Sequence, residues 1–223
     1  MTNVAVIDYG MGNLRSVAKA LEAALVTTDA GSSTGPVRVV VTSDPASILQ
    51  ADRVVFPGQG AMRDCMAELQ DRKLENVVRE CVKTKPFLGI CMGLQVLMDF
   101  SEENGGRAGL GIVGGQVIRF QQPAADASGA KLKIPHMGWN QVHQTQAHPL
   151  WQDIAQDSRF YFVHSYYVAP TDTDLVAATT DYPTPFTSVV AKDNVFAVQF
   201  HPEKSQRAGL RLLANFLQWN GRV

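Results

Sequence analysis

The first half of the chain alternates short β-branched segments with longer segments of helical periodicity, and this alternation restricts the possible folds more than any other feature. We predict buried strands at Val4–Asp8, Val37–Val41, Arg53–Phe56 and Pro86–Ile90. Between them, apolar residues recur three or four positions apart, as they do in a helix with one buried face. Strands that alternate with helices pair in parallel and are covered on both faces. Reactive groups in such sheets lie beyond the carboxyl ends of the strands.

The second half of the chain has a different pattern. Between Gly109 and Gln199 it is rich in Val, Phe, Tyr and Thr and is divided by Gly and Pro, which predicts antiparallel or mixed strands. Ser205–Trp219 has helical periodicity, and the small polar segments Gly31–Pro36 and Pro123–Gly129 are predicted to be exposed loops. We therefore expect one α/β domain over residues 1–223, with a mixed, mainly parallel central sheet flanked by helices and a β-rich second half.

Composition narrows the class of protein. Hydrophobic residues make up 45% of the chain and charged residues 18%, which excludes a disordered chain. A net charge of −1 without a basic run gives no sign of a nucleic-acid or anionic-membrane surface. The three cysteines are an odd number for a disulfide scaffold, and Phe87–Met98, the most apolar segment, is too short to span a bilayer. With no signal-peptide pattern at the start, we expect a soluble cytoplasmic protein.

A candidate nucleophile lies where a predicted strand meets a predicted helix. Cys91 has a glycine two positions to either side, Gly89 and Gly93, in the arrangement of the nucleophile elbow of serine hydrolases. The glycines let the chain turn sharply and let a substrate approach, and the start of the helix favours a thiolate and a developing oxyanion. The alternative is a buried, unreactive cysteine, which is our interpretation of Cys65 and Cys81.

A candidate base follows the alternating segment Phe196–Phe200, at His201-Pro202-Glu203. In an extended chain, residues two apart point to the same side, so Glu203 could orient the imidazole of His201. A thiolate paired with an imidazolium is a good nucleophile at neutral pH. The alternative is a solvated surface turn, and the cysteine elbow in the same sheet favours the catalytic interpretation.

The other histidines are not predicted to bind metal. His136, His143 and His148 lie in one β-rich stretch, but their spacing fits neither a zinc finger nor the zincin pattern. We expect structural or surface roles for these three, and no metal or cofactor. His164, which follows an aromatic segment, is predicted to be a hydrogen-bonded residue that lines a pocket.

Several blocks resemble the class I glutamine amidotransferases, a family with a Cys–His–Glu triad. These blocks are Gly89–Gln95, Pro57–Gly60 and His201–Glu203. Within that family the chain is more similar to the glutaminase subunits of imidazole glycerol phosphate synthases, which act in histidine biosynthesis. The blocks that carry this closer resemblance are Asp8–Leu14, Pro135–Asn140, Phe162–Tyr166 and His201–Ser205.

The resemblance implies an activity and a fold, that of the class I glutamine amidotransferases. Cys91 would attack the side-chain carboxamide of glutamine and form a thioester. His201, held by Glu203, would protonate the leaving ammonia and then activate water. The oxyanion hole would use the backbone N–H of Met92 and one from the Gln59-Gly60 turn, where Gln59 stands in place of an expected small aliphatic residue. A backbone donor requires no particular side chain, so the implied role stands.

The resemblance also implies substrate-binding residues. Gly60, Gln95, Ser165 and Tyr166 match positions that hold the amino-acid end of glutamine. Glu103, which we predict at the end of the same helix as Gln95, is a candidate ligand for the substrate ammonium. The alternative for Glu103 is a solvated helix terminus.

A protein partner is implied as well. Free ammonia is protonated in water, so the family delivers it to a cyclase subunit, typically a (β/α)₈ barrel, that makes imidazole glycerol phosphate and an aminoimidazole carboxamide ribotide. We expect a heterodimer with this cyclase, with its interface at two glycine-containing turns. The predicted interface residues are Met11, Asn13, His136, Met137 and Trp139. The alternative for Trp139 is packing inside a β-rich core.

Two other functions compete with this one. A glutaminase of the same superfamily could serve another synthase, such as that of the pyridoxal-phosphate pathway, but it would not need the Asp8–Leu14 or Pro135–Asn140 blocks. A flavodoxin-like module could cradle a phosphate at Gly10–Gly12. That alternative leaves the cysteine elbow and His201–Glu203 unexplained.

Overall fold

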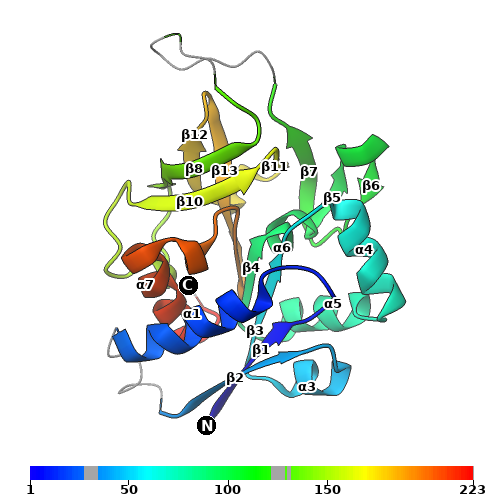
Figure 1. Ribbon diagram of the computed structural model, residues 1–223, viewed down its shortest axis with the longest axis vertical. Coiled ribbons are helices and arrows are strands. Elements are labelled where there is room, and N and C mark those ends of the chain that lie inside the picture. The colour runs from blue at the N-terminus through cyan, green and yellow to red at the C-terminus, as the bar shows by residue number, and fades with distance from the viewer. Residues whose placement is uncertain (28–34, 122–128, 130–131, 223) are drawn as a thin grey trace.

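The computed structural model describes residues 1–27, 35–121, 129 and 132–222. Most of the two predicted loops, Gly31–Pro36 and Pro123–Gly129, lies outside the described residues. The predicted strand–helix alternation is confirmed, with one set of helices on each face of the parallel strands (Figure 1). None of the described helices is long and apolar enough to cross a membrane.

The parallel part of the main sheet matches the prediction closely. Its strands, in spatial order, are β2 (Val37–Thr42), β1 (Thr2–Ile7), β3 (Arg53–Gly58), β4 (Phe87–Cys91) and β14 (Val195–Val198). Each pairs in parallel with its neighbour. The first four strands come from the first half of the chain, and β14 adds the segment that leads to His201. The candidate nucleophile and the candidate base therefore leave adjacent parallel strands at the same edge of the sheet.

The β-rich second half continues this sheet beyond β14. The continuation is built from β13 (Pro185–Lys192), β11 (Tyr166–Pro170), β7 (Val113–Arg119), β5 (Met98–Ser101) and β6 (Arg107–Ala108), with β12 (Val176–Asp181) beside β13 and β9 (His143–Gln144) beside β12. Its pairs are antiparallel except β5 with β7. A separate antiparallel pair is formed by β8 (His136–Gln141) and β10 (Arg159–His164).

The helices divide between the two faces of the sheet. On one face lie α1 (Leu14–Thr27) and α7 (Gln206–Gln218), and on the other lie α3 (Pro45–Gln50), α4 (Met62–Asp71) and α5 (Glu75–Thr84) (Figure 1). Short 3₁₀ turns occur at Glu103–Gly105, Pro149–Trp151, Thr173–Leu175 and Pro202–Lys204. Asp44 caps α3, since its carboxylate accepts a 2.8 Å bond from the N–H of Ser47.

Two hydrophobic cores lie on the two faces of the parallel strands. In β1, Val4 and Val6 pack into the core beneath α1 and α7, whereas Ala5 and Ile7 pack into the core beneath α3, α4 and α5. Successive side chains of a strand point to opposite faces, and here both faces are covered. That is why the strand sequences are almost continuously apolar.

The helix that we predict after Cys91 is much shorter than its apolar pattern indicates. It is a single turn, α6 (Met92–Gln95). The next residues join the sheet instead, because the Leu97 carbonyl accepts bonds from the N–H groups of Ile112 (2.8 Å) and Val113 (2.9 Å). The segment after Gln95 therefore pairs with β7, although the spacing of its apolar residues alone favours a helix. Glu103 consequently does not end the helix of Gln95, as we predicted, but lies in the 3₁₀ turn after β5.

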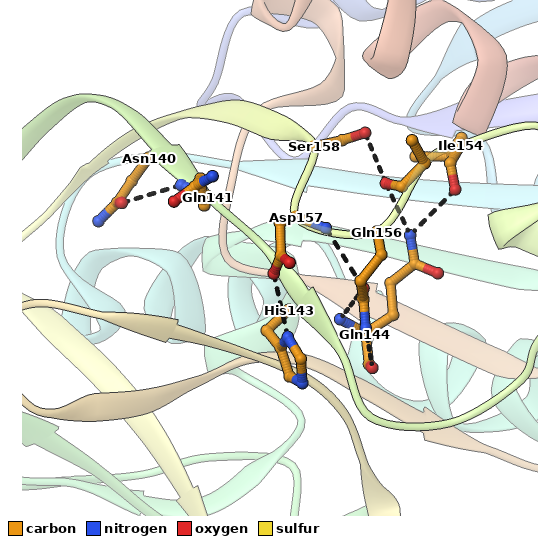
Figure 2. Close-up of polar contacts among 9 residues, drawn as sticks. Asn140, Gln141, His143, Gln144, Ile154, Gln156, Asp157 and Ser158 are labelled. Atoms are coloured by element: carbon orange, nitrogen blue, oxygen red, sulfur yellow. Dashed lines mark hydrogen bonds and ion pairs between the residues drawn. The ribbon is translucent and has the colours of Figure 1, made fainter.

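A polar clamp holds the loop that enters β10. Gln144 and Gln156 exchange two bonds, from the Gln144 N–H to Gln156 Oε1 (2.8 Å) and from Gln156 Nε2 to the Gln144 carbonyl (2.9 Å) (Figure 2). The exposed His143 ring contacts the Asp157 carboxylate at 3.0 Å in the same cluster. His143 thus has the surface role that we predicted, and the clamp fixes the start of the strand that leads to His164.

Candidate active site

Cys91 occupies a strained turn between β4 and α6. Its backbone has φ 54° and ψ −104°, a conformation that residues other than glycine rarely adopt. Such strain persists only where the surrounding structure enforces it, and it is concentrated at functional sites. The sharp strand–turn–helix geometry predicted for this cysteine is therefore present.

The glycines on either side of Cys91 are required by backbone packing. A Cβ on Gly93 would lie 1.9 Å from the carbonyl oxygen of Phe56 in β3, and one on Gly89 would lie 2.6 Å from the carbonyl oxygen of Gly93. The turn after the cysteine is thus pressed against two neighbouring strands. We expected the glycines to provide a sharp turn and access for substrate, but their neighbours show that close packing of α6 on the sheet is what excludes a side chain.

His201 and Glu203 meet, as their spacing predicts. His201 Nδ1 lies 2.9 Å from Glu203 Oε1, and the two side chains are only 4% and 2% exposed. A hydrogen bond to a buried carboxylate fixes both the ring orientation and the position of one ring proton. Glu203 therefore orients the imidazole, and the alternative of a solvated surface turn is wrong.

Strand β10 and Ser205 hold the backbone of His201 in place. The His201 N–H donates to the Tyr161 carbonyl (2.9 Å), and Ser205 Oγ donates to the His201 carbonyl (2.6 Å). The Ser205 hydroxyl also accepts a bond from the Tyr161 N–H (3.0 Å). Our interpretation of the sequence gave Ser205 no role, although its place four residues after the histidine is a signal for such a clamp.

The surroundings of His201 favour its charged form. Burial lowers the pKa of the imidazole, but the Cys91 sulfur and the Glu203 carboxylate outweigh this effect and raise the pKa to about 10. His201 is therefore protonated at neutral pH. Its Nε2 is buried without a hydrogen bond of ordinary geometry among the described residues, so this nitrogen is the one available for proton transfer beside Cys91.

Gln199 also contacts the cysteine, which the sequence analysis missed. Its Nε2 lies 3.5 Å from Cys91 Sγ, and its side chain is fully buried. The register of β14 on β4 pairs Val198 with Ile90, which brings the next residues of the two strands together. The signal in the sequence is a single polar residue within the apolar segment Phe196–Phe200.

The turn after β3 lies against Met92, the residue that follows the cysteine. Gly58 pairs with Cys91 across the sheet, and a Cβ on Gly58 would lie 2.7 Å from the Met92 Cβ. The next two residues, Gln59 and Gly60, are exposed, and Gly60 has φ +97°. The turn predicted to supply an oxyanion donor is therefore adjacent to the other predicted donor, Met92.

The predicted substrate residues surround the same end of the sheet. Gln95 Nε2 donates to the Tyr166 carbonyl (3.1 Å) and to Gln199 Oε1 (3.0 Å), so only its carbonyl oxygen remains for a ligand. Ser165 and Tyr166 are half-buried. Glu103 Oε2 accepts a 2.8 Å bond from the Met62 N–H, which ties this carboxylate to the start of α4.

The predicted interface residues divide into exposed and buried groups. Met137 and Trp139 are 61% and 38% exposed on one face of β8, so the alternative of an internal Trp139 is wrong. Met11 is half-buried beside Gly60. His136 is only 3% exposed and stacks on Tyr182, with ring centroids 3.9 Å apart, so its side chain is not available to a partner as we expected.

Asn13 is exposed and lies at the start of α1, where its carbonyl accepts bonds from the N–H groups of Ser16 (3.1 Å) and Val17 (3.2 Å). The same glycine-containing turn is closed by Asp8, whose carboxylate accepts a 2.9 Å bond from the Gly10 N–H. The first predicted interface turn therefore has a defined conformation that is set by its own side chains.

Cys65, Cys81 and His148 are also buried. Burial raises the pKa of Cys65 to about 12 and that of Cys81 to about 11, so both are poor nucleophiles at neutral pH. Burial lowers the pKa of His148 to about 4, and its ring accepts a bond from the Leu150 N–H (3.1 Å). Among the described residues, no group of three His, Cys, Asp or Glu side chains could hold a metal ion.

Known proteins resemble this chain over almost its full length. The family model of the class-I glutamine amidotransferases matches residues 5–219. The chain is 62% identical over 220 residues to the imidazole glycerol phosphate synthase subunit HisH of Methylococcus capsulatus, covering 98% of this chain and 97% of the relative. It is 61% identical over 221 residues to the subunit of the same name from Nitrosococcus oceani, covering 99% of each.

A solved structure shows the same fold at low sequence identity. The glutaminase domain of Trypanosoma brucei CTPS, with bound acivicin, superposes with a TM-score of 0.62 and 18% identity, covering 99% of this chain and 95% of that chain. The fold class that we predicted is therefore confirmed.

Proposed function

Because this chain belongs to the class I glutamine amidotransferase family, we propose that it is the glutaminase subunit of an imidazole glycerol phosphate synthase and hydrolyses L-glutamine to L-glutamate and ammonia. The observation that carries this proposal is the buried His201–Glu203 pair beside a cysteine in a strained turn. A charged imidazole held next to a sulfur atom is the arrangement that a cysteine nucleophile needs.

The first half of the reaction is acyl transfer to sulfur. The Cys91 thiolate attacks the carboxamide carbon of glutamine, forming a C–S bond and placing a negative charge on the carbonyl oxygen. When this tetrahedral intermediate collapses, the C–N bond breaks and His201 donates its proton to the departing nitrogen. The products are ammonia and a γ-glutamyl thioester on Cys91.

The second half is hydrolysis of the thioester. His201 is now neutral and takes a proton from water, whose oxygen attacks the thioester carbon. The C–S bond breaks, glutamate leaves, and the thiolate and the imidazolium are restored. Glu203 keeps the ring in one orientation through both steps and compensates its charge when the ring is protonated.

Backbone N–H groups stabilise the oxyanion in both steps. We assign these donors to Met92 and to the Gln59-Gly60 turn, which the register of Gly58 with Cys91 supports. One well-placed donor contributes about 3–4 kcal/mol in a transition state. The conformation of the Gln59-Gly60 turn therefore has a large effect on the rate.

The amino-acid end of glutamine binds beside this turn. We assign its contacts to Gly60, to the side-chain oxygen of Gln95, and to Ser165 and Tyr166 at the start of β11. Glu103 is the candidate partner of the substrate ammonium, and its position next to the start of α4 supports a place near Gly60.

The ammonia passes to a cyclase subunit, which uses it to make imidazole glycerol phosphate and an aminoimidazole carboxamide ribotide. The exposed apolar side chains Met137 and Trp139 on β8 support docking of such a partner, and Met11 lies beside the Gln59-Gly60 turn. We therefore propose a heterodimer whose interface surrounds the ammonia exit, formed by the turns that contain Met11 and Asn13 and by the exposed face of β8.

The proposal is tested by replacing the nucleophile. Cys91→Ala should abolish glutamine-dependent synthesis by the complex and leave ammonia-dependent synthesis intact, as measured by glutamate release and by product formation. Cys81→Ala, which changes a buried cysteine on α5, is the matched control and should keep both activities. Retention of glutamate release by Cys91→Ala would contradict the proposed function.

A further inference from the structure

A continuous chain of hydrogen bonds joins strand β8 to the sulfur of Cys91. From β8, Asn140 Nδ2 donates to His136 Nε2 (3.3 Å), and His136 Nδ1 donates to His164 Nε2 (3.0 Å). The Tyr166 carbonyl accepts from both His164 Nδ1 (2.8 Å) and Gln95 Nε2 (3.1 Å). Gln95 Nε2 also donates to Gln199 Oε1 (3.0 Å), and Gln199 Nε2 donates to Cys91 Sγ (3.5 Å). The proposed reaction uses Cys91 as the nucleophile and Gln95 and Tyr166 as substrate contacts, and it gives no role to Asn140, His136, His164 or Gln199.

The backbone determines the orientation of the two glutamines. The Tyr166 carbonyl can only accept, so the Gln95 atom that faces it must be the amide nitrogen. That nitrogen also faces Gln199, which must therefore present its oxygen to Gln95. The nitrogen of Gln199 is left pointing at the cysteine, where it can only donate. Rotating the Gln95 amide by 180° would place its oxygen against the Tyr166 carbonyl oxygen. Rotating the Gln199 amide would place two N–H donors against each other.

The same carbonyl determines the tautomers of the two histidines. His164 must carry its proton on Nδ1, which donates to the Tyr166 carbonyl, and its Nε2 is then an acceptor. His136 must accordingly donate from Nδ1 and accept at Nε2. The two rings meet because His136 and His164 are directly opposite each other in the register of β8 and β10. Both rings must be neutral for the chain to be intact.

Asn140 anchors the far end of the chain on β8. Its nitrogen donates to the Asp181 carbonyl (2.9 Å) as well as to His136, and its oxygen accepts from the Gln141 N–H (2.8 Å). Every amide and ring in the chain therefore has one allowed orientation, set by backbone groups at its middle and at its end.

We propose that Gln199 is a positioning residue for the Cys91 sulfur, and that the His136–His164 pair, anchored on β8, holds the Tyr166 carbonyl that orients Gln95 and, through it, Gln199. The inference rests on the proposed function, because it assigns Cys91 as the nucleophile. A neutral N–H donor aimed at the sulfur stabilises the thiolate and restricts the sulfur to one position. Gln199 cannot accept a proton there, so it does not compete with His201.

The two faces of β8 connect this chain to the proposed partner. Met137 and Trp139 are exposed on one face, whereas His136 and Asn140 point to the other, as alternate residues of a strand do. A cyclase that binds the exposed side chains therefore contacts the strand that anchors the chain. Docking can change the position of the sulfur without touching it.

The charged groups around the chain are compatible with neutral rings. Burial lowers the pKa of His136 to about 4 and that of His164 to about 3, to which the nearby His201 contributes. The titratable groups around Cys91 are His201 and Tyr9, with Glu203 behind His201. Gln199 adds a donor to this set without adding a charge.

The first test measures how fast iodoacetamide alkylates Cys91 in the full chain between pH 5 and pH 10. Gln199→Met keeps the length of the side chain and removes the donor, so alkylation at pH 6 should slow about tenfold while the rates converge at pH 10. Cys65 and Cys81 do not interfere below pH 9, because burial raises the pKa of both thiols. Ser188→Ala is the matched control, since its buried hydroxyl makes no hydrogen bond among the described residues, and it should keep the parental profile.

A parental pH profile for Gln199→Met would overturn the proposal, and so would an equal loss of rate at every pH, which would indicate altered access to the sulfur. Alkylation needs no glutamine, so its outcome does not depend on whether the chain is a glutaminase. The proposed function itself fails if the parent complex releases no glutamate from glutamine.

The second test addresses the β8 end of the chain. His136→Phe preserves the ring that stacks on Tyr182 and breaks the chain, so alkylation at pH 6 should slow about threefold. An unchanged profile would exclude the link to β8. In the parent chain, ¹⁵N NMR at pH 7 should find both His136 and His164 neutral with the proton on Nδ1. A charged ring or the other tautomer would overturn the chain, and this measurement does not depend on any variant folding.

Discussion

His201 and His164 are both buried, at 3% and 6% exposed, yet the two regions around them shift the pKa of their rings in opposite directions. Beside His201, at the edge of the parallel strands, the Cys91 sulfur and the Glu203 carboxylate outweigh burial and raise the pKa to about 10. Beside His164, between β8 and β11, the neighbours are a backbone carbonyl and the neutral ring of His136, and burial lowers the pKa to about 3.

The difference shows that burial alone does not identify a reactive histidine. Removing an imidazole from water always disfavours its charged form, so a protonated buried ring needs an anion within reach. One region of this molecule supplies that anion and keeps its ring protonated. The other region satisfies its rings with neutral partners and becomes a structural link.

The largest expected effect comes from replacing each of the two histidines in turn by asparagine. His201→Asn should lower glutamate release by the cyclase complex about 10⁴- to 10⁶-fold, because it removes the proton carrier. His164→Asn should lower it at most about tenfold, because it loses only a link in the chain. The measurement is glutaminase kcat under saturating glutamine. Similar losses in the two variants would erase the distinction between the regions.

The next largest effect comes from removing the negative charge of Glu203. Glu203→Gln should lower kcat about 10³-fold, because the ring loses both its orientation and the charge that stabilises its proton. With one of its anionic neighbours gone, the pKa of His201 should fall. The basic limb of the pH–rate profile should therefore move to lower pH. A profile that keeps its basic limb would mean that Glu203 does not influence the proton on His201.

Stability as a function of pH should separate the regions further. Folded His201 holds its proton more tightly than the unfolded chain does, so its stabilising contribution is complete below pH 6.5 and is lost as the pH rises toward about 10. The His136–His164 pair behaves in the opposite way. Its rings are held neutral, so its contribution is complete above pH 6.5 and is lost as the pH falls toward 4 and 3.

Urea unfolding at a series of pH values measures both limbs. Combining His136→Phe with His164→Leu should reduce the loss of stability between pH 6.5 and pH 4 by several kcal/mol. His201→Asn should flatten only the alkaline limb. If the double variant altered the alkaline limb instead, the assignment of neutral rings to His136 and His164 would be wrong.

The smallest effect concerns the exposed face of β8. Trp139→Ala should weaken association with the cyclase about 5- to 10-fold and change the free energy of unfolding by less than about 0.5 kcal/mol. Val41→Ala is the matched control, because Val41 on the edge strand β2 is 39% exposed, against 38% for Trp139. Titration calorimetry with the cyclase measures the first quantity. Equal binding by the two variants would place the interface away from β8.

Local patterns in the sequence were sufficient to predict much of the fold and part of the site. The parallel strands follow from apolar runs that act over a few positions. The Cys91 turn and the His201–Glu203 contact were also predictable, because their partners are one or two residues away in the chain. The length of α6 was not, because its end depends on pairing with β7, whose residues lie far along the sequence.

The sequence by itself determined the candidate reactive groups of this protein: a cysteine between two glycines, and a histidine two residues before a glutamate. Only the tertiary structure decided that Gln199 contacts the sulfur, that His136 is buried against His164, and that Glu103 lies outside the helix of Gln95. The physical reason is sequence separation. Contacts across β4–β14 and β8–β10 depend on strand register, and register is set by the packing of the whole sheet rather than by any short segment.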